Sequence, residues 1–273
     1  MGTIPDSPLG KATAWPEAYD ASLLYAVERA PQRAALSIGE RLPFHGEDRW
    51  TGWEPTWLDE RGVPRVAIVR FAVPCESPRI VESKSVKLWL ASLYRTAFAS
   101  PEDVRELLVR DLSAATGAPV RVELDLPDAW SRLARVEPEG VELDREAPAS
   151  IPAFPDAALL HAAGPAAKET LVMRSFRSVC PVTGQPDYAC VTIGCDGPAI
   201  DRAALFAYLL GFRRHAGFHE HCVERIYVDL VRRCAPASLV VHARFTRRGG
   251  IDINPWRASD AALVPPATLG LRQ

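Results

Sequence analysis

The stretch RSVCPVTGQPD, residues 177–187, is the segment around which the rest of this chain is organised. Its prolines and glycine indicate a rigid turn between extended segments at residues 170–179 and 188–193. Cys180 stands early in the turn, and Asp187 closes it. Because the thiolate is the reactive form of cysteine, a thiol near a carboxyl group is typical of a nucleophile with its proton donor. Cysteine is also among the most often buried residue types, so an inert packing thiol is the alternative interpretation.

The overall composition is that of a soluble globular protein with small-molecule partners. Of 273 residues, 48% are hydrophobic and 24% are charged, which supports one large domain or two of ordinary size. The net charge of -2 offers no basic surface to nucleic acid or to an anionic membrane. The first residues lack the apolar stretch of a secretory signal peptide, and no run approaches the ~18 apolar residues of a membrane span. We therefore expect a cytoplasmic protein.

The cysteines are too few and too irregularly spaced for a disulfide framework, so we expect reduced thiols. They are Cys75, Cys180, Cys190, Cys195, Cys222 and Cys234. Cys190 and Cys195 lie near the turn, and we interpret them as strand residues.

A proline-rich segment divides the chain into two halves. Residues 139–157 carry three prolines among small and charged residues, which is typical of a linker. We predict an N-terminal arm at residues 1–40, a first module at residues 41–138 that carries ESKSVK, and a second module at residues 158–273 that carries the Cys180 turn.

Each half shows the same order of predicted elements: two strands, two helices and a strand. The first half has a hairpin within residues 50–73, helices over residues 86–94 and 104–112, and a strand at residues 119–126. Before the second of these helices, Ser100 is placed to cap it and Pro101 to take its first turn. The second half has the two extended segments beside the turn, helices over residues 202–214 and 220–233, and a strand at residues 239–244. This repetition predicts an α+β fold in which two diverged units each lay a helix pair on one face of an antiparallel sheet.

The sequence ESKSVK begins the first predicted helix. Glu82 can accept hydrogen bonds from the donor edge of a ligand, and Ser83 or Ser85 can cap the helix. The helix N-terminus with Lys84 and Lys87 forms an anion-binding corner. A solvated, charged helix start is the alternative interpretation.

The sequence FHEHC precedes the last predicted helix. Histidine is the residue type suited to proton transfer near neutral pH, which makes His219 a candidate, and Glu220 can clamp a planar ligand beside Phe218. One alternative is an ordinary acidic helix start. Another is a zinc site made of His219, His221, Cys222 and a distant thiol. Two histidines at that spacing do not face one ligand from a regular helix, and no Cys-x-x-Cys pair completes the set.

The sequence RFTRRGGIDINPWR, residues 244–257, reads as a basic turn that continues into an aromatic residue. Its two adjacent arginines and two glycines allow close backbone approach and bidentate binding of phosphate. A solvated turn is the alternative. No strand is followed by GxGxxG or a Walker loop, so a nucleotide cofactor would not occupy a Rossmann crevice.

These motifs together resemble a known enzyme family. Four motifs, taken in their order along the chain, resemble the NADPH-dependent 7-cyano-7-deazaguanine reductases, the nitrile reductases of queuosine biosynthesis. The four motifs are ESKSVKLW, the Cys180 turn, FHEHCVERI and TRRGGIDINPWR. The position of ESKSVK before the cysteine resembles the long, two-module form. The likeness runs from Asp20 to the C-terminus and is weakest at residues 128–155.

The resemblance implies a fold, an assembly and a reaction. The fold is the tunnelling fold (T-fold) shared with GTP cyclohydrolase I, in tandem copies within each chain, and the assembly is a homodimer. The reaction is reduction of the nitrile of 7-cyano-7-deazaguanine to an aminomethyl group with two NADPH.

The resemblance also implies roles for individual residues. Cys180 would attack the nitrile carbon and form a thioimide, Asp187 would protonate the nitrile nitrogen, and His219 would assist this transfer and hold the substrate. The remaining residues line the two ligands: Glu82 and Glu220 would grip the base with Val81, Ser83 and Phe218 nearby, and Ser83, Lys84, Arg248 and Gly249 would contact NADPH. No metal is implied.

Two other functions remain open from the residues alone. One is a zinc-dependent GTP cyclohydrolase-like hydrolase on the same fold, which requires cysteine and histidine ligands. The other is a deazapurine-binding module whose cysteine is structural, which predicts binding without reaction.

Overall fold

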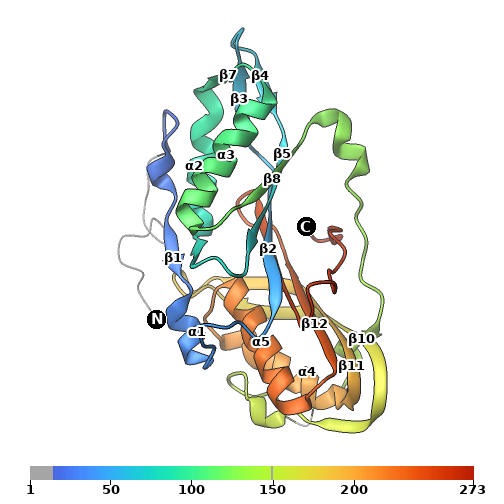
Figure 1. The fold of residues 1–273 in the computed structure, drawn as a ribbon. Helices are drawn as coiled ribbons and strands as arrows, with labels where there is room; N and C mark the ends of the chain where they lie inside the picture. The colour runs from blue at the N-terminus through green and yellow to red at the C-terminus, as the bar shows by residue number, and fades with distance from the viewer. Residues whose placement is uncertain (1–14, 149) are drawn as a thin grey trace.

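One eight-stranded sheet runs through both halves of the chain (Figure 1). The computed structural model describes residues 15–148 and 150–273. Every neighbouring pair of strands is antiparallel except the last, which is parallel. The strand order is β8 (Arg121–Asp125), β5 (Ile68–Pro74), β2 (His45–Gly52), β13 (Ile251–Ala258), β12 (Ser238–Phe245), β11 (Pro186–Ile200), β10 (Ala162–Val179) and β9 (Val141–Glu142).

The two halves meet where β2 pairs with β13. The register runs from His45 opposite Ala258 to Gly52 opposite Ile251. The units predicted from the repeat therefore do not have separate sheets: their strands are joined edge to edge by backbone hydrogen bonds.

A pair of helices covers each half of this sheet (Figure 1). In the first half these are α2 (Ser83–Ala91) and α3 (Pro101–Thr116), and in the second half α4 (Arg202–Leu210) and α5 (His219–Cys234). A shorter helix, α1 (Ala30–Ala35), lies near α5. The predicted α+β class and the predicted helices are confirmed.

Short elements complete the described fold. Two small sheets pair β1 (Ala26–Glu28) with β6 (Arg79–Val81), and β3 (Thr56–Asp59) with β4 (Pro64–Val66) and β7 (Ala97–Phe98). The predicted hairpin is confirmed in the β3–β4 pair. The 3-10 helices are η1 (Ala21–Leu23), η2 (Ser92–Arg95), η3 (Pro127–Arg132), η4 (Leu143–Arg145), η5 (Ala157–Leu159) and η6 (Gly211–Arg214).

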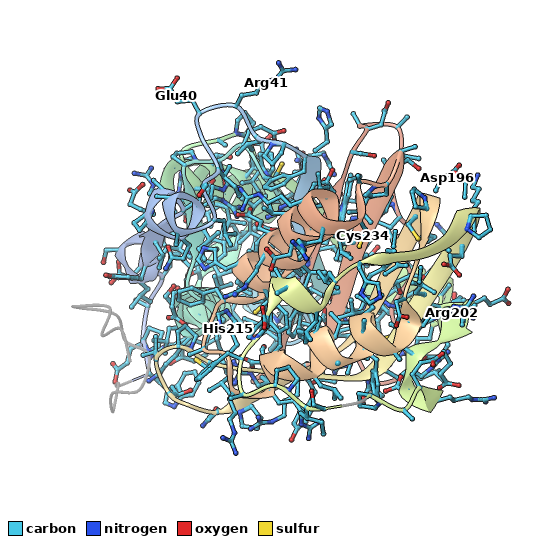
Figure 2. The ribbon with its side chains drawn as sticks, turned by 90° about the horizontal axis from the view of Figure 1, so that it is seen from below. Glu40, Arg41, Asp196, Arg202, His215 and Cys234 are labelled. Atoms are coloured by element: carbon cyan, nitrogen blue, oxygen red, sulfur yellow. The ribbon has the colours of Figure 1, made fainter. Side chains whose placement is uncertain are left out.

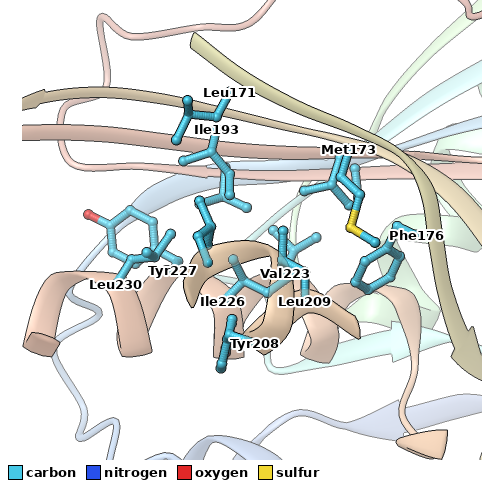
Figure 3. Close-up of a cluster of buried hydrophobic side chains, with 14 of the residues drawn as sticks. Leu171, Met173, Phe176, Ile193, Tyr208, Leu209, Val223, Ile226, Tyr227 and Leu230 are labelled. Atoms are coloured by element: carbon cyan, nitrogen blue, oxygen red, sulfur yellow. The ribbon is translucent and has the colours of Figure 1, made fainter. Parts of the chain in front are cut away.

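Apolar side chains between the sheet and the helices form the core of the second half. Figure 3 shows Val223, Ile226 and Leu230 of α5 facing Leu171 and Ile193 of the sheet. The three helix residues are spaced by three and four positions, so they lie on one face. All five are at most 1% exposed, and each such burial contributes about 1.5–3 kcal/mol.

The helix starts show one correct and one wrong prediction. Ser100 caps α3 in a reciprocal capping box with Asp103, and Pro101 takes the first turn as predicted. The cap of α2, however, is neither Ser83 nor Ser85. The Glu82 carboxylate accepts from the backbone N–H groups two and three residues later, which leaves the serines inside the helix.

The segment interpreted as a basic turn is mostly a strand. Only residues 246–250 connect β12 to β13, and every residue of β13 is buried. The glycines and arginines favoured a turn in the sequence. Arg257 is nevertheless fully buried because Asp48 and Glu224 neutralise its charge.

The segment predicted as a linker also contributes to the fold. Strand β9 lies within it and pairs with β10, and Leu143 is fully buried. The Asp144 carboxylate accepts hydrogen bonds from the backbone N–H groups of Arg174 and Ser175. The boundaries of the two modules stay a prediction.

The predicted N-terminal arm contains η1, β1 and α1. Its residues 1–14 lie outside the described chain. Figure 2 shows Glu40 and Arg41 on a loop that projects from the body of the protein. The arm is nevertheless anchored, since Arg29 and Arg33 are buried.

The cysteines are all free and buried, which agrees with the predicted reduced thiols. Cys234, labelled in Figure 2, is the last residue of α5. Across residues 15–148 and 150–273, none of the helices is long and apolar enough to cross a membrane.

Candidate active site

The Cys180 turn is the tight connection between β10 and β11. The Cys180 N–H donates to the Gln185 carbonyl at 2.8 Å, and the Gly184 N–H donates to the Cys180 carbonyl at 3.1 Å. Gly184 has a φ of 70°, a conformation that glycine adopts without the steric cost of a Cβ. These bonds fix the position of the thiol, and Cys180 is only 4% exposed.

Asp187 stands at the start of β11 with a buried carboxylate. Its Oδ2 is 3.5 Å from His219 Nε2, and its Oδ1 is 2.8 Å from Arg248 Nη2. The Arg248 contact is an ion pair whose alignment falls short of a hydrogen bond, so Oδ1 has no hydrogen-bond partner within the described chain. The carboxylate thus contacts both a titratable ring and a cation.

His219 is the first residue of α5 and is held by an aromatic neighbour. Its imidazole stacks on the Phe245 ring at the end of β12, with centroids 3.8 Å apart and planes 22° apart. This stacking orients the ring while Nε2 faces Asp187. The preceding Phe218 occupies the N-cap position without a side-chain cap.

The FHEHC segment does not form a zinc site in this structure. His219 and His221 line two different hollows. Within the described residues, no group of three His, Cys, Asp or Glu side chains is placed to hold a metal ion. The alternative ligand set with Cys222 is therefore not brought together.

Glu220, the second residue of α5, is a buried carboxyl group with an unusual titration. Burial raises its pKa to about 8, and the nearby Asp48 carboxylate adds to this rise. Arg29 and Arg257 act in the opposite direction. The Glu220 carboxyl group is therefore mainly protonated at neutral pH when no ligand is bound.

A buried network of charges lies one turn further along α5. Arg257 contacts Glu224 at 2.8 Å and Asp48 at 2.9 Å, Arg33 contacts Glu224 at 2.6 Å, and Arg29 contacts Asp48 at 2.5 Å. Burial opposes the charge of Glu224, but the arginines outweigh it and lower its pKa to about 2. The network ties α1, β2 and β13 to the beginning of α5.

Glu82 is buried at the start of α2 and is occupied by the helix itself. One oxygen accepts the Lys84 N–H at 2.6 Å, and the other accepts the Ser85 N–H at 2.9 Å. Burial raises the pKa of this carboxyl group, and the two backbone hydrogen bonds limit the rise. Glu82 thus caps a helix, whereas Glu220 does not.

These elements surround one small hollow of about 330 Å³ including its open mouth, which we call the active-site hollow. Its lining residues are Trp50, Val81, Ser83, Cys180, Pro181, Asp187, Gly217, Phe218, His219, Glu220, Arg248 and Ile253. Most of the residues predicted for the site lie here. The exceptions are Glu82, Lys84 and Gly249.

The comparison with known proteins agrees with this geometry. Three relatives carry the name NADPH-dependent 7-cyano-7-deazaguanine reductase. The protein of Bordetella avium is 46% identical over 99% of both chains, that of Paraburkholderia phytofirmans 49% over 94%, and that of Burkholderia lata 49% over 98%. The chain belongs to this reductase family. The resemblance seen in the motifs is confirmed.

Two models of the reductase family match the two halves. A model described as nitrile reductase, 7-cyano-7-deazaguanine-reductase N-term, matches residues 15–124, and one described as QueF-like protein matches residues 186–262. The first contains ESKSVK, and the second begins at the end of the Cys180 turn.

Motif reasoning missed several residues that line the active-site hollow. Trp50 and Ile253 are opposite each other in the β2–β13 pair and line the hollow from the sheet. The alternation of Ile251 and Ile253 was a strand signal that was available in the sequence. Nothing in the sequence pairs Asp48 with Arg257, because they are more than 200 residues apart.

Proposed function

We propose that this protein reduces the nitrile of 7-cyano-7-deazaguanine to an aminomethyl group with two NADPH, in queuosine biosynthesis. The observation that carries the proposal is the meeting of Cys180, Asp187, His219 and Glu220 in one hollow. A thiol, a proton donor pair and a base-binding carboxylate are the groups that this reaction needs.

The first step is covalent addition. The Cys180 sulfur attacks the nitrile carbon, so that one S–C bond forms and the C≡N bond becomes C=N. Asp187 delivers a proton to the nitrogen and recovers one from the thiol, with His219 as its neighbour in this transfer. The product is a thioimide, a better hydride acceptor than a nitrile.

NADPH, when bound, would supply the hydrides that turn this carbon into CH₂. The S–C bond breaks between the two reductions, so that the Cys180 sulfur leaves as a thiolate and the C=N bond is restored for the second reduction. Overall, one nitrile, two NADPH and two protons give one aminomethyl group and two NADP⁺. The residues of the chain hold the base, expose the carbon beside Cys180 and provide the protons through Asp187 and His219. Burial of the thiol keeps water away from the thioimide.

Substrate recognition is assigned to the carboxylates. An ionised Glu220 can accept hydrogen bonds from the ring N–H and the exocyclic amine of a guanine-like base, while Phe218 packs beside it. Val81 and Ser83 also line the hollow. The Glu82 carboxylate caps α2 and does not line the hollow. Its side chain would therefore have to move locally to contact the base.

The residues proposed for NADPH fit the group in their chemistry. Ser83 and Arg248 line the hollow, and Lys84 follows in the first turn of α2. Gly249 and Gly250 have positive φ angles of 57° and 79°, so the turn exposes backbone with no side chain. Hydroxyl, ammonium and guanidinium donors beside bare backbone suit phosphate oxygens.

We further propose the family's assembly and location for this chain. The modules would be tandem tunnelling folds, the chain a homodimer, and the protein cytoplasmic without direct nucleic-acid contact. The continuous, mainly antiparallel sheet with two helix pairs supports the fold, and the net charge of -2 supports the absence of direct nucleic-acid contact.

The test is incubation with 7-cyano-7-deazaguanine and NADPH, followed by the absorbance of the nicotinamide and by mass spectrometry of the protein. We expect substrate-dependent oxidation of NADPH and, without NADPH, a thioimide adduct on Cys180. The variant Cys180→Ala should bind the base but form no adduct. Binding without any reaction in the unmodified protein would favour a binding module instead.

A further inference from the structure

Phe218, the residue proposed to pack beside the base, lines two hollows at once. One is the active-site hollow. The other, which we call the rear hollow, encloses about 820 Å³ together with its open side. Its lining residues include Gln32, Leu36, Pro181, His215, His221 and Arg225. Since Phe218 borders open space in both hollows, the direction of its ring decides which of them it fills.

Hydrogen bonds fix the backbone of Phe218 but not its ring. The residue is the N-cap of α5, with an extended backbone conformation (φ -64°, ψ 157°). Its carbonyl accepts the Cys222 N–H at 3.0 Å, which ties the backbone to the first turn of the helix. The phenyl ring carries no polar atom and can turn between staggered rotamers. Its position therefore depends on the side chains that pack against it.

His221 packs against this ring from the same helix. Three positions separate the two residues, so they are neighbours at the start of α5. The ring centroids are 5.6 Å apart and the planes meet at 70°, an edge-to-face arrangement. This geometry is favoured because the positive edge of one ring meets the negative face of the other. His221 is only 6% exposed, so the contact lies inside the protein.

The His221 imidazole is suited to packing rather than to proton transfer. It is not among the described residues that line the active-site hollow. Within the described chain, neither of its ring nitrogens has a hydrogen-bond partner. Burial lowers its pKa to about 4, so the ring is neutral at pH 7. A neutral, buried ring in contact with Phe218 can support that residue without taking part in the chemistry.

The rear hollow is an unfavourable place for the Phe218 ring. Gln32 Oε1 and Arg225 Nε line it and are buried, and like the His221 nitrogens they have no hydrogen-bond partner in the described part of the chain. An apolar ring turned into this hollow would separate these polar atoms from water, which costs free energy. The polar lining and the His221 ring therefore both favour the ring position in the active-site hollow.

We propose that His221 is a positioning residue that holds the Phe218 ring in the active-site hollow, where the ring packs on the base of the substrate. The inference rests on the proposed function, because it needs the base beside Phe218. His221 thereby sets the affinity for the base. The rate of thioimide formation does not depend on it, because Cys180 and Asp187 are held by other contacts.

Calorimetry with 7-cyano-7-deazaguanine tests this in the Cys180→Ala background, where the base binds without forming an adduct. His221→Ala should weaken binding about two- to tenfold, the loss expected for one aromatic pair. His221→Phe keeps an aromatic edge against Phe218 and should restore the affinity to within about twofold. In a Phe218→Ala background, His221→Ala should have no further effect, because the ring that it holds is gone.

The matched control is His242→Ala. His242 is also a buried histidine, 7% exposed, with an Nε2 that has no partner among the described residues. It lies on β12 and does not line the active-site hollow. Its loss should lower the melting temperature, as the loss of His221 does, but leave the affinity for the base unchanged. For a fold that does not tolerate the cavity at residue 221, His221→Leu fills the space without an aromatic edge and should weaken binding at least about twofold.

Three results would overturn the assignment: unchanged affinity in His221→Ala or His221→Leu, an equal loss in His242→Ala, or an additive loss in the Phe218→Ala background. Thioimide formation at saturating base is also followed in the variants that retain Cys180. Its rate should equal that of the unmodified protein, and a slower rate in His221→Ala would show a general distortion of the site instead. Failed positioning tests with normal adduct formation refute the role of His221 alone, whereas no binding and no adduct in the unmodified protein refute the proposed function.

Discussion

The helices α2 and α5 both begin next to the active-site hollow with a buried glutamate, but they use it differently. Glu82 is the N-cap of α2 and accepts two backbone hydrogen bonds. Glu220 lies inside the first turn of α5, whose N-cap Phe218 has no side-chain cap. The first glutamate is occupied by its own helix, and the second is left for a ligand at the cost of a strongly raised pKa.

The surroundings of the two helices follow the same division. α5 is anchored by the buried network of Glu224, Arg257 and Asp48, which draws on strands from both halves. α2 is held by hydrogen bonds among its own first residues, such as that from the Ser85 hydroxyl to the Glu82 carbonyl, and by neutral donors, such as the Trp89 indole N–H that donates to Asp111. The second half therefore anchors its glutamate-bearing helix through buried ion pairs between distant segments, and the first half through hydrogen bonds from neutral donors.

The largest expected effect is on turnover. Asp187→Asn should lower the rate of NADPH oxidation about 10²–10⁴-fold, because the amide cannot deliver the proton to the nitrile nitrogen. Steady-state kinetics at pH 7 measures this. The control is Asp125→Asn in the first half, which breaks the comparable ion pair with Arg70 away from the hollow. Equal losses in both variants would contradict the role of Asp187.

The next effect is on stability. Glu224→Gln should reduce the free energy of unfolding by about 3–5 kcal/mol, because Arg257 and Arg33 are left buried without their shared carboxylate. Urea denaturation gives this value. The native pKa of Glu224 is about 2, so its contribution is present above the ordinary value of 4.5 and is lost as the pH falls from about 4.5 to about 2.

A matched change in the first half is Asp111→Asn. Asp111 accepts hydrogen bonds from Tyr19 and Trp89 and contacts the exposed Arg110. Its loss should cost about 1–3 kcal/mol, since neutral donors rather than buried charges lose their partner. A cost as large as that of Glu224→Gln would show that both halves depend equally on buried charge.

A smaller effect is expected in the pH dependence of base binding. As the pH increases towards 8, the affinity for 7-cyano-7-deazaguanine should rise by up to about tenfold per pH unit. The reason is that the ionised Glu220 carboxylate accepts hydrogen bonds from both donors of the base, whereas the protonated form does not. Calorimetry with Cys180→Ala isolates binding from adduct formation. Glu220→Gln should weaken binding and flatten its pH profile. A profile that stays steep in this variant would assign the titration to another group.

The smallest effect separates the two glutamates by stability. Glu82→Gln should lower the free energy of unfolding by about 0.5–2 kcal/mol, because the helix loses a charged cap. Glu220→Gln should not lower the free energy of unfolding at pH 8, because at that pH it replaces a buried carboxyl group that is partly ionised. The raised pKa of Glu220 means that its stabilising contribution is present below 4.5 and is lost as the pH rises through about 8. Thermal unfolding at pH 6 and 8 compares the two variants.

Much of the local structure could be predicted from short patterns. Ser100 and Pro101 mark the start of α3, and the spacing of Val223 and Ile226 marks the inner face of α5. These signals are local, because capping and apolar periodicity depend on neighbours within one or two turns. The turn with Cys180 and Asp187 is local in the same sense, although the roles of these residues stay a prediction.

The cap of α2 and the full length of strand β13 could not be predicted in this way. A serine is the usual cap, and nothing in ESKSVK says that the glutamate takes this place. The alternation of Ile251 and Ile253 indicates a strand after the two glycines, but only the buried partners of Arg257 allow this strand to include a charged residue.

The sequence by itself determined the class of the fold, the positions of the main helices and the family to which the chain belongs, because each depends on short patterns and ordered motifs. Only the tertiary structure decided that the halves share one sheet, that Glu82 caps a helix while Glu220 remains for a ligand, and that Asp187 lies between His219 and Arg248. Burial and charge pairing between distant segments decide these points, and neither is written in any single stretch of the chain.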